Sequence, residues 1–540
     1  MALLFLWRLM LVELALVDDR QLDGAAAGIE DDMAASVMQF KEAKTVRPSQ
    51  PAWLWAILLC ASGLPRILAA FMLPNPDGDA YSYLETIDRM RADLVAGSFS
   101  AKTLYSFWLP MYQFICALIS ALVNHPVYVS KLVSAVCGTG VCVLVFLITL
   151  RLTANRIVSL VAALVVAVNP LHVLYSAFSL TEIPHALVVM GSLYAAITGR
   201  WTAATVCAAI AGFMRVESWM LIALLPALER LAGRRVSIRL CGLLLLAPLL
   251  WLAICWAATG DFLAYLHERS RYVNDIVAAY PHLQTLSLTR LWQNAYSLVH
   301  SANPAVMIGC FVGSGLIIRR SLGAGLPKHS ENRLAVVAVA IFFFAYLSFL
   351  VAAFLTGNQP DIWDRYGLIF FTSGLPLAAW TYLQITRERP RLAVALAAAM
   401  LVVCITETRS QIKDAGEIVR RTSPQLIIAN KLQDLYLIHT DIRILCDDRV
   451  VAALSEIPPE RMSNSSSLPA EAQRILADLD KRGIDYIVYR KDDEGSPLNI
   501  FPELKDGIPN ERFELVAPAF MTDWHGNVYL YRLHKPGQKK

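Results

Sequence analysis

The stretch Leu73-Pro-Asn-Pro-Asp-Gly-Asp-Ala-Tyr-Ser-Tyr-Leu-Glu85 follows directly on an apolar run, residues 53–73, that is long enough to cross a bilayer. The two prolines and the glycine in this stretch predict that the apolar helix ends there. Two carboxylates, Asp77 and Asp79, are therefore expected within one helical turn of a membrane surface, on a loop between two helices.

From Ala80 onward the chain predicts a second helix that lies along the membrane interface. Its apolar positions have helical spacing: Tyr81, Leu84, Ile87 and Met90. A carboxylate fixed between two helices at a membrane face suits general-base chemistry on a lipid-borne substrate. The alternative is that one of the two aspartates only caps the interfacial helix. Asp79 is the candidate for chemistry.

Composition places the chain among polytopic membrane proteins. Of 540 residues, 56% are hydrophobic and 17% are charged, and the mean hydropathy is +0.48, whereas soluble proteins carry about 25% charged residues. The net charge of +4 is small, which argues against nucleic acid as a partner. Nine of the ten cysteines lie in apolar runs and no CxxC pair occurs, so neither a disulfide framework nor a thiolate metal site is predicted.

The apolar runs predict an all-α membrane bundle of about eleven spans. We expect spans at 53–73, 128–150, 157–176, 185–198, 202–213, 218–231, 240–258, 304–318, 334–355, 368–385 and 392–405. Three parts follow: a cytoplasmic N-terminal segment 1–50, with Met33 or Met38 as an alternative start, a membrane domain 51–406, and a polar domain 407–540.

The segment 107–123 is apolar, and the distribution of basic residues decides whether it crosses. If it does not, the arginines and lysines between spans fall on one side throughout, which the positive-inside rule assigns to the cytoplasm. We therefore expect a re-entrant or interfacial helix here. The opposite face then receives acidic residues and arginines from several short loops: Asp77, Asp79, Glu182, Arg215, Glu217, Asp261, Asp361, Asp364 and Arg365. Solvated loops would also hold such residues, but their position at span ends favours one shared extracytoplasmic cavity.

The polar C-terminal part reads as a small extracytoplasmic α/β domain. A helix is predicted over 469–482, ended by Gly483, and strands over 442–446, 484–489, 513–517 and 528–533.

Several motifs in order resemble the polytopic GT-C glycosyltransferases, in the branch that contains protein O-mannosyltransferases, the aminoarabinose transferase of lipid A and the Rgt-type bacterial sugar transferases. The resemblance covers roughly residues 50–400. It is carried by the PNPDGDAYSYLE segment, by 131–138 (KLVSAVCG), by 169–185 (NPLHVLYSAFSLTEIPH), by 212–219 (GFMRVESW) and by 364–366 (DRY).

The resemblance implies an inverting transfer of a sugar from a polyprenyl-phosphate donor to an acceptor hydroxyl, outside the cytoplasm at the bacterial inner membrane. Asp79 matches the family's general base, although Ala80 stands where the family often has a second acid. Glu182 matches the acidic position of the second outer loop, and a helix-start carboxylate is its alternative reading. Arginine binds phosphate oxygens bidentately, so Arg365 and then Arg215 are the donor-phosphate candidates. The expected substrate contacts are Asp77, Tyr81, His185, Glu217, Asp364 and Tyr366.

Other polar residues have structural readings. Arg66 lies inside the first span, so it is expected to face the bundle interior or to snorkel, with Glu182 or Asp79 as a candidate partner. Lys131, near an end of the second span, is expected to snorkel to the interface. Arg215 and Glu217 are alternatively a local ion pair at a helix break. No cofactor is predicted, a divalent metal is left open, and the acceptor is a glycan, a lipid or a protein. Two other functions stay open: a secondary transporter, and a non-catalytic scaffold with an outer binding domain.

Overall fold

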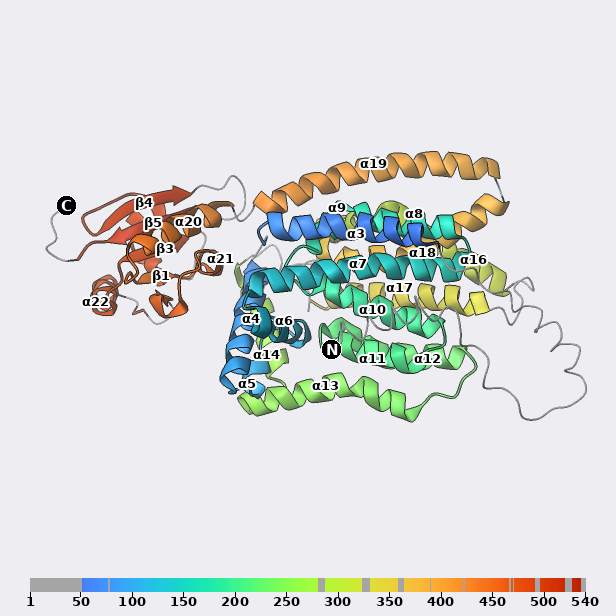
Figure 1. Cartoon of the computed structure of the whole chain (residues 1–540), viewed down its shortest axis with the longest axis horizontal. Helices are drawn as coiled ribbons and strands as arrows, with labels where there is room; N and C mark the ends of the chain where they lie inside the picture. Colours follow the sequence, from blue (N-terminus) through green and yellow to red (C-terminus); the bar gives the residue numbers. More distant parts are fainter. Residues whose placement is uncertain are drawn as a thin grey trace, which may run out of the picture. The chain divides into compact units, whose positions relative to one another are not determined.

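A computed structural model of the chain describes its helical part and its C-terminal domain (Figure 1). The described residues are 51–75, 78–279, 287–322, 331–357, 364–388, 390–420, 423–465, 468–469, 471–490, 496–519 and 527–535. The N-terminal segment 1–50, Asp77 and Asp361 lie outside them.

Five helices within the described residues are long and apolar enough to span a membrane: α3 (Ala52–Met72), α7 (Pro126–Thr153), α13 (Ile238–Thr259), α17 (Glu331–Leu355) and α18 (Asp364–Glu388). The shortest, α3, has 21 residues and reaches about 31 Å, which matches the hydrocarbon core. A sixth candidate is the pair α15 (Leu288–Ala302) and α16 (Pro304–Leu322), which meet at 92°. The chain is a multi-pass membrane protein, as predicted.

Helices occupy the other predicted spans, but several are too short to cross a bilayer alone. These are α8 (Arg156–Val168), α10 (Glu182–Ile197), α11 (Trp201–Gly212) and α12 (Leu221–Leu231), while 392–405 lies inside α19 (Pro390–Arg420). By helix length the described residues thus support five or six spans.

The predicted continuous span 157–176 is wrong, because the helix breaks at Asn169. Pro170 has no N–H to continue the ladder, and the Asn169 Oδ1 instead accepts a hydrogen bond from the His172 backbone N–H at 2.8 Å. A separate helix, α9 (Pro170–Tyr175), begins there. The break leaves carbonyl groups at the end of α8 that need donors.

Arg66 supplies those donors from the bundle interior, where the sequence placed it, and its partners are backbone carbonyls rather than Glu182 or Asp79. Its fully buried guanidinium donates to the carbonyls of Val166 (3.1 Å) and Ala167 (3.0 Å). It also contacts the His172 Nδ1 at 2.7 Å. A buried charge in a membrane bundle is expensive unless it is hydrogen-bonded, and here the broken helix provides the acceptors.

Lys131 also bonds to a backbone carbonyl. Its side chain is buried, and the ammonium donates to the carbonyl of Leu73, where α3 ends. Arg66 and Lys131 therefore both stabilise helix ends, because each donates to backbone carbonyls there.

Short polar and amphipathic helices gather at one end of the bundle: α4 (Gly78–Ala96), α5 (Ala101–Leu104), α6 (Met111–Val123) and α14 (Ala264–Ala279) (Figure 1). The helix α6 has 13 residues and spans about 20 Å, less than the bilayer core. It packs on α4 and α7, in agreement with the prediction that 107–123 does not cross.

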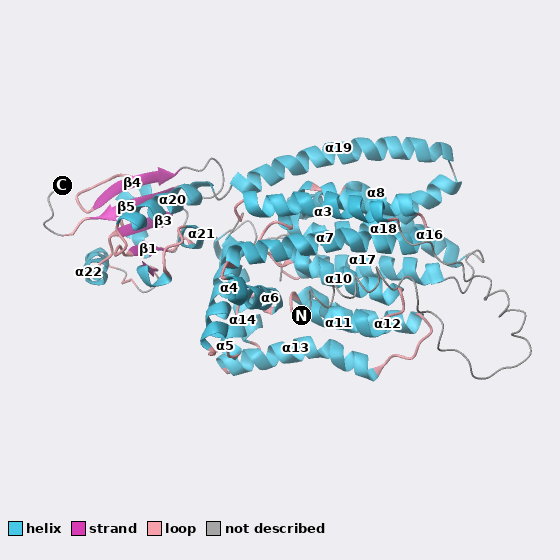
Figure 2. Ribbon diagram, in the orientation of Figure 1, coloured by secondary structure: helices cyan, strands magenta, loops and turns pink. Residues whose placement is uncertain are grey.

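The C-terminal domain is built on a five-stranded mixed sheet with the order β2-β1-β3-β5-β4 (Figure 2). The strands are β1 (Ile444–Cys446), β2 (Met462–Ser463), β3 (Tyr486–Arg490), β4 (Phe513–Ala519) and β5 (Val528–Leu533). Pairs β1–β2 and β1–β3 are parallel, and β5 is antiparallel to both β3 and β4. The predicted strands are all present, whereas the two-residue β2 and the helix α20 (Ser423–Ile438) were not predicted.

Alternate residues of each central strand face two separate cores. Ile444 and Val488 pack with α20 and α21 (Arg449–Leu454) on one face. Leu445 and Ile487 pack with α22 (Ala472–Arg482) and α23 (Pro502–Asp506) on the other. Helices therefore cover both faces of the sheet, the arrangement that parallel strands require.

The close packing of α7 against Arg66 and α9 generates the first prediction. A Cβ on Gly138 would lie 2.2 Å from the Ser176 Oγ and 2.9 Å from the Arg66 Nε. Gly138→Ala should therefore cost about 1–3 kcal/mol of overpacking, more than the gain of about 1 kcal/mol in helix propensity. The expected result is a lower midpoint of thermal unfolding, followed by tryptophan fluorescence in detergent. Gly242→Ala in α13, with nothing within 4 Å, is the matched control and should leave the midpoint unchanged or raise it.

Candidate functional site

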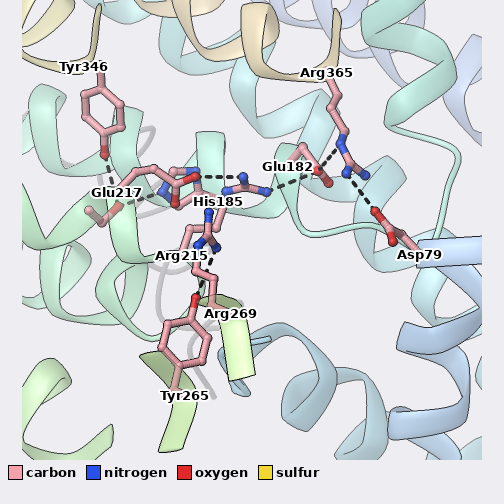
Figure 3. Close-up of polar contacts among 10 residues, drawn as sticks. Asp79, Glu182, His185, Arg215, Glu217, Tyr265, Arg269, Tyr346 and Arg365 are labelled. Atoms are coloured by element: carbon pink, nitrogen blue, oxygen red, sulfur yellow. Dashed lines mark hydrogen bonds and ion pairs between the residues drawn. The ribbon is translucent and has the colours of Figure 1, made fainter. Parts of the chain in front are cut away.

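Five charged residues from four separate segments converge near the end of the bundle (Figure 3). Asp79 lies in the first turn of α4, Glu182 is the first residue of α10, and Arg365 is the second residue of α18. Arg215 and Glu217 lie at the break between α11 and α12, where a 3-10 turn (Val216–Met220) replaces a continuous helix. Each charge thus occurs at a helix end, where the backbone leaves polar groups unsatisfied.

The five residues alternate in sign and are linked in one chain of ion pairs. Arg215 donates from Nη2 to the Glu217 Oε1 at 2.8 Å and from Nη1 to the Glu182 Oε1 at 3.1 Å. The same Glu182 oxygen lies 3.5 Å from the Arg365 Nε. Arg365 then donates from Nη2 to the Asp79 Oδ2 at 2.7 Å. The order is therefore Glu217, Arg215, Glu182, Arg365, Asp79.

Asp79 is the most accessible member of this chain. Its side chain is 28% exposed, against 7% for Glu182 and 9% for Arg365. The sequence placed Asp79 on a loop, and this was wrong, because α4 begins one residue earlier, at Gly78. The helix dipole favours a carboxylate in the first turn of a helix. At this position Asp79 can therefore stabilise α4 and also take part in chemistry.

Burial and charge act in opposite directions on the two residues of the helix break. Burial lowers the pKa of the Arg215 guanidinium, but the charges of Glu217 and Glu182 outweigh it and hold the pKa well above its ordinary value. Burial raises the pKa of the Glu217 carboxyl, yet Arg215 outweighs it and lowers this pKa to about 2. Both groups are therefore ionised at neutral pH, and the pair is not merely local, since Arg215 also bonds Glu182.

The ring of Tyr366 contacts both arginines. The Arg215 Cζ lies 5.3 Å and the Arg365 Cζ 5.7 Å from the ring centroid, within the range of cation–π attraction. The aromatic ring therefore helps to hold two guanidinium groups of like charge in the same site.

His185 belongs to a neighbouring hydrogen-bonded row rather than to the chain of charges. Its Nε2 lies 2.7 Å from the Ser218 Oγ, which lies 3.0 Å from the Tyr346 Oη. All three side chains are buried. The row ties α10 and α17 to the turn that carries Arg215.

Tyr81 lies apart from these contacts. It is 2% exposed and donates to the carbonyl of Asn75 at 3.4 Å. Asn75 in turn accepts from the Ser179 backbone N–H at 2.9 Å, so the loop before α4 is fastened to the loop before α10. Asp77 is outside the described residues, and of the Asp364 side chain nothing is described.

Three residues of α14 approach the site and were not singled out from the sequence. Arg269 donates from Nη1 to the Tyr265 Oη at 3.4 Å (Figure 3). Burial lowers the pKa of Arg269, but the charges of Tyr265 and Glu217 outweigh it and raise this pKa. Burial raises the pKa of Tyr272, and the Asp79 charge acts in the same direction. The only sequence signal was a basic, aromatic helix in the insert that follows α13.

A small cavity of about 40 Å³ lies against the charged chain, room for about one water molecule. One part of its lining is charged and includes Glu182, Arg215, Glu217 and Arg365. The other part is apolar and comes from α17 and α18: Phe349, Leu350, Leu368, Ile369 and Phe370. A larger ligand would have to open this cavity, and would meet charge on one side and hydrocarbon on the other.

Among the described residues no group of three or more His, Cys, Asp or Glu side chains has metal-site geometry. In the charged chain each carboxylate has an arginine partner, so a cation at this site would meet two guanidinium groups.

Comparisons with solved structures identify the fold. ArnT from Cupriavidus metallidurans in the apo state matches with a TM-score of 0.52 at 12% identity. The match covers 89% of this chain and 98% of the ArnT chain. The same protein bound to undecaprenyl phosphate has a TM-score of 0.51 at 12% identity, with coverage of 88% and 98%. The oligosaccharyltransferase of Archaeoglobus fulgidus, tethered with an acceptor peptide, has a TM-score of 0.48 at 11% identity, with coverage of 88% and 74%.

No family model and no curated protein sequence matches the chain. The structural likeness confirms the predicted GT-C fold, a polytopic helical membrane domain with a C-terminal α/β domain.

The contacts of Arg215 generate the second prediction. Arg215→Met would leave Glu217 without its partner in a part-buried site. Breaking a fully buried pair costs about 3–5 kcal/mol, and the 21% exposure of the Glu217 side chain reduces that cost. We expect a clearly lower midpoint of thermal unfolding in detergent. Arg215→Met/Glu217→Gln should recover part of the loss because it removes the orphaned charge. Arg230→Met, at an exposed position of α12, is the control. Equal stability of wild type and Arg215→Met would contradict the ion-pair chain.

Proposed function

We propose that this chain is a membrane glycosyltransferase that moves a sugar from a polyprenyl-phosphate donor to an acceptor hydroxyl, with inversion. The observation that carries the proposal is the ion pair between the accessible Asp79 and Arg365, at one end of the row of five charged residues. It joins a candidate base and a candidate phosphate ligand at 2.7 Å. The GT-C fold supports the class of enzyme, and the bound undecaprenyl phosphate of the ArnT structure supports the class of donor.

Arg365 is the proposed ligand of the donor phosphate. The five-residue chain carries three carboxylates and two guanidinium groups, so it has no free positive charge for an anion. A phosphate that binds within this five-residue chain must therefore take the place of a carboxylate on an arginine, and the most exposed carboxylate is Asp79. Guanidinium groups bind phosphate oxygens bidentately, so Arg365 can exchange one partner for the other.

This exchange would couple donor binding to catalysis. While Asp79 is paired with Arg365, its Oδ2 accepts a charge-assisted hydrogen bond and is not available to an acceptor hydroxyl. When phosphate takes over Arg365, the Asp79 oxygen becomes available for the acceptor. Asp79 would then act as a base only with the donor in place.

The reaction balances without any further reactant. Asp79 takes the proton of the acceptor hydroxyl, whose oxygen attacks the anomeric carbon from the face opposite the phosphate. The bond between that carbon and the phosphate oxygen breaks, and polyprenyl phosphate leaves with the electron pair. Positioning and charge compensation carry most of the rate, because phosphate is a good leaving group.

Glu182, Arg215 and Tyr366 would position Arg365. Glu182 contacts both guanidinium groups through one oxygen, while its Oε2 is buried without a hydrogen-bond partner among the described residues. That free oxygen is a candidate acceptor for a sugar hydroxyl. The proposed substrate contacts also keep His185, Glu217, Asp77 and Asp364, whereas the buried Tyr81 supports the loop before α4.

The apolar side of the cavity would receive the start of the polyprenyl chain. Phe349 and Leu350 on α17 and Ile369 and Phe370 on α18 border the charged residues. A lipid phosphate matches this lining, because its anionic head would meet the charged residues and its hydrocarbon chain the apolar ones. A glycan, lipid or protein would be the acceptor.

The basic residues between spans favour an orientation with the charged site and the C-terminal domain outside the cytoplasm, in a bacterial inner membrane. Flipped polyprenyl-phosphate sugars would meet the site on that face.

The third prediction concerns the base. Purified protein in lipid, given a panel of polyprenyl-phosphate sugars and membrane extract, should release polyprenyl phosphate. Asp79→Asn should lower the rate by about 10²–10⁴-fold, the usual contribution of a general base. Release is measured by thin-layer chromatography of the labelled lipid.

Asp88→Asn is the matched control, since Asp88 lies on the same helix in a half-exposed pair with Arg91, and it should leave the rate unchanged. Thermal midpoints of both variants test that they are folded. Equal release by wild type and Asp79→Asn would remove Asp79 from the mechanism, whereas no release by either with any donor would contradict the proposed activity.

The fourth prediction concerns orientation. In a cysteine-free background, Ser98→Cys after α4 should react with a membrane-impermeant maleimide on intact cells. Ser321→Cys near the end of α16 should react only after the cells are permeabilised. The reverse pattern would place the charged site in the cytoplasm.

A further inference from the structure

We infer that the C-terminal domain contains a second ligand site, a pocket that binds a neutral polyhydroxylated molecule such as a single sugar ring. The pocket has a volume of about 220 Å³ and shares no residue with the chain of ion pairs. Its lining consists of Asp447, Asp448, Val488, Tyr489, Arg490, Ser496 and Leu498.

The pocket lies where the carboxyl ends of two neighbouring parallel strands meet. Asp447 and Asp448 directly follow β1, Arg490 is the last residue of β3, and Ser496 precedes the turn Pro497–Ile500. The strands β1 and β3 lie side by side (Figure 2), and their register runs from Ile444 with Tyr486 to Cys446 with Val488.

The chain leaves these two strands toward opposite faces of the sheet. After β1 it enters α21, whose Val451 belongs to the core shared with α20. Beyond residues 491–495, which lie outside the described residues, Leu498 and Phe501 belong to the core shared with α22. Diverging connections at the carboxyl ends of adjacent strands open a crevice, and ligands of open α/β sheets bind at such a point.

Asp448 presents an unused acceptor to this crevice. Its Oδ1 caps α21, accepting from the backbone N–H groups of Val450 (2.9 Å) and Val451 (3.1 Å). The residue is only 6% exposed, yet its Oδ2 has no hydrogen-bond partner among the described residues. An unsatisfied buried carboxylate oxygen costs free energy, so a ligand that donates to it would bind favourably.

Arg490 lies opposite this oxygen and brings a positive charge and hydrogen-bond donors to the pocket. Its Nη1 lies 3.8 Å from the Asp448 Oδ2, beyond hydrogen-bond distance, and its side chain is about one-third exposed. Asp447 adds a second carboxylate, whose Oδ1 accepts from the Ser465 backbone N–H at 2.7 Å. The pocket therefore offers acceptors and a donor within one small volume.

This combination selects the class of ligand. A metal cation would be repelled by the Arg490 guanidinium, and only two acidic side chains line the pocket. Phosphate would be repelled by the carboxylates of Asp447 and Asp448. A hydroxyl group both donates and accepts, so adjacent hydroxyls of a sugar can bond a carboxylate and the guanidinium together.

The test uses full-length protein in deuterated detergent and saturation-transfer difference NMR. The probes are the methyl glycosides of glucose, mannose, galactose and N-acetylglucosamine at millimolar concentration. At least one glycoside should bind to the wild-type protein. Asp448→Asn should raise the Kd of that glycoside about tenfold, which corresponds to about 1.4 kcal/mol. Asparagine keeps the Oδ1 that caps α21, so this variant should remain folded, with an unchanged thermal midpoint. Arg490→Gln is a second variant with the same expected loss.

Asp434→Asn, at an exposed position of α20, is the matched control and should bind as wild type does. Asp79→Asn should also leave this binding unchanged, which separates the pocket from the proposed transferase activity. The inference is overturned if no glycoside binds, if Asp448→Asn and Arg490→Gln bind as wild type does, or if Asp79→Asn abolishes the signal. It is equally overturned if magnesium, calcium or inorganic phosphate binds in an Asp448-dependent way and the glycosides do not.

Discussion

One carboxylate, Glu182, organises the charged site, because a single oxygen of it faces two arginines. Arg215 donates to this oxygen at 3.1 Å and the Arg365 Nε lies 3.5 Å from it. Two guanidinium groups of like charge stay close together in a buried site only if an anion lies between them. Glu217 and Asp79 then complete the outer contacts of the two arginines. The position of the proposed base therefore depends on Glu182, although Asp79 does not touch it.

The bundle uses its helix ends in two different ways. Where a helix breaks deep in the bundle, a basic side chain satisfies the exposed carbonyls, as Arg66 does at the end of α8. Where helices begin at the polar end, carboxylates occupy the first turns, as Asp79 and Glu182 do. Both follow from the unpaired backbone groups at helix ends. The first use stabilises the fold, and the second places carboxylates in the proposed site.

The two proposed sites follow from different architectures. The site of Asp79 and Arg365 exists because several helix ends meet. The pocket of Asp448 and Arg490 exists because two parallel strands send the chain to opposite faces of a sheet. A transferase with both would hold a donor by its phosphate in the membrane domain and a soluble glycan in the C-terminal domain.

Sequence alone determined the membrane class and the α/β nature of the C-terminal domain, and the resemblance of several motifs predicted the GT-C fold. Five of the nine charged residues expected on one face are those that cluster. Hydrophobic periodicity and basic-residue bias are local properties, and span ends identify which polar residues share one face. Tertiary structure alone decided the partners: Arg66 bonds backbone carbonyls instead of an acid, Lys131 bonds Leu73, and Arg215 bridges two carboxylates. It also decided that Arg269 of α14 approaches the site, and that the Asp448 Oδ2 remains free of hydrogen bonds among the described residues. Such pairings depend on distances between segments up to 286 residues apart, as for Asp79 and Arg365. The spacing of residues along the sequence does not reveal which distant side chains will touch, because the packing of the helices sets the distances between them.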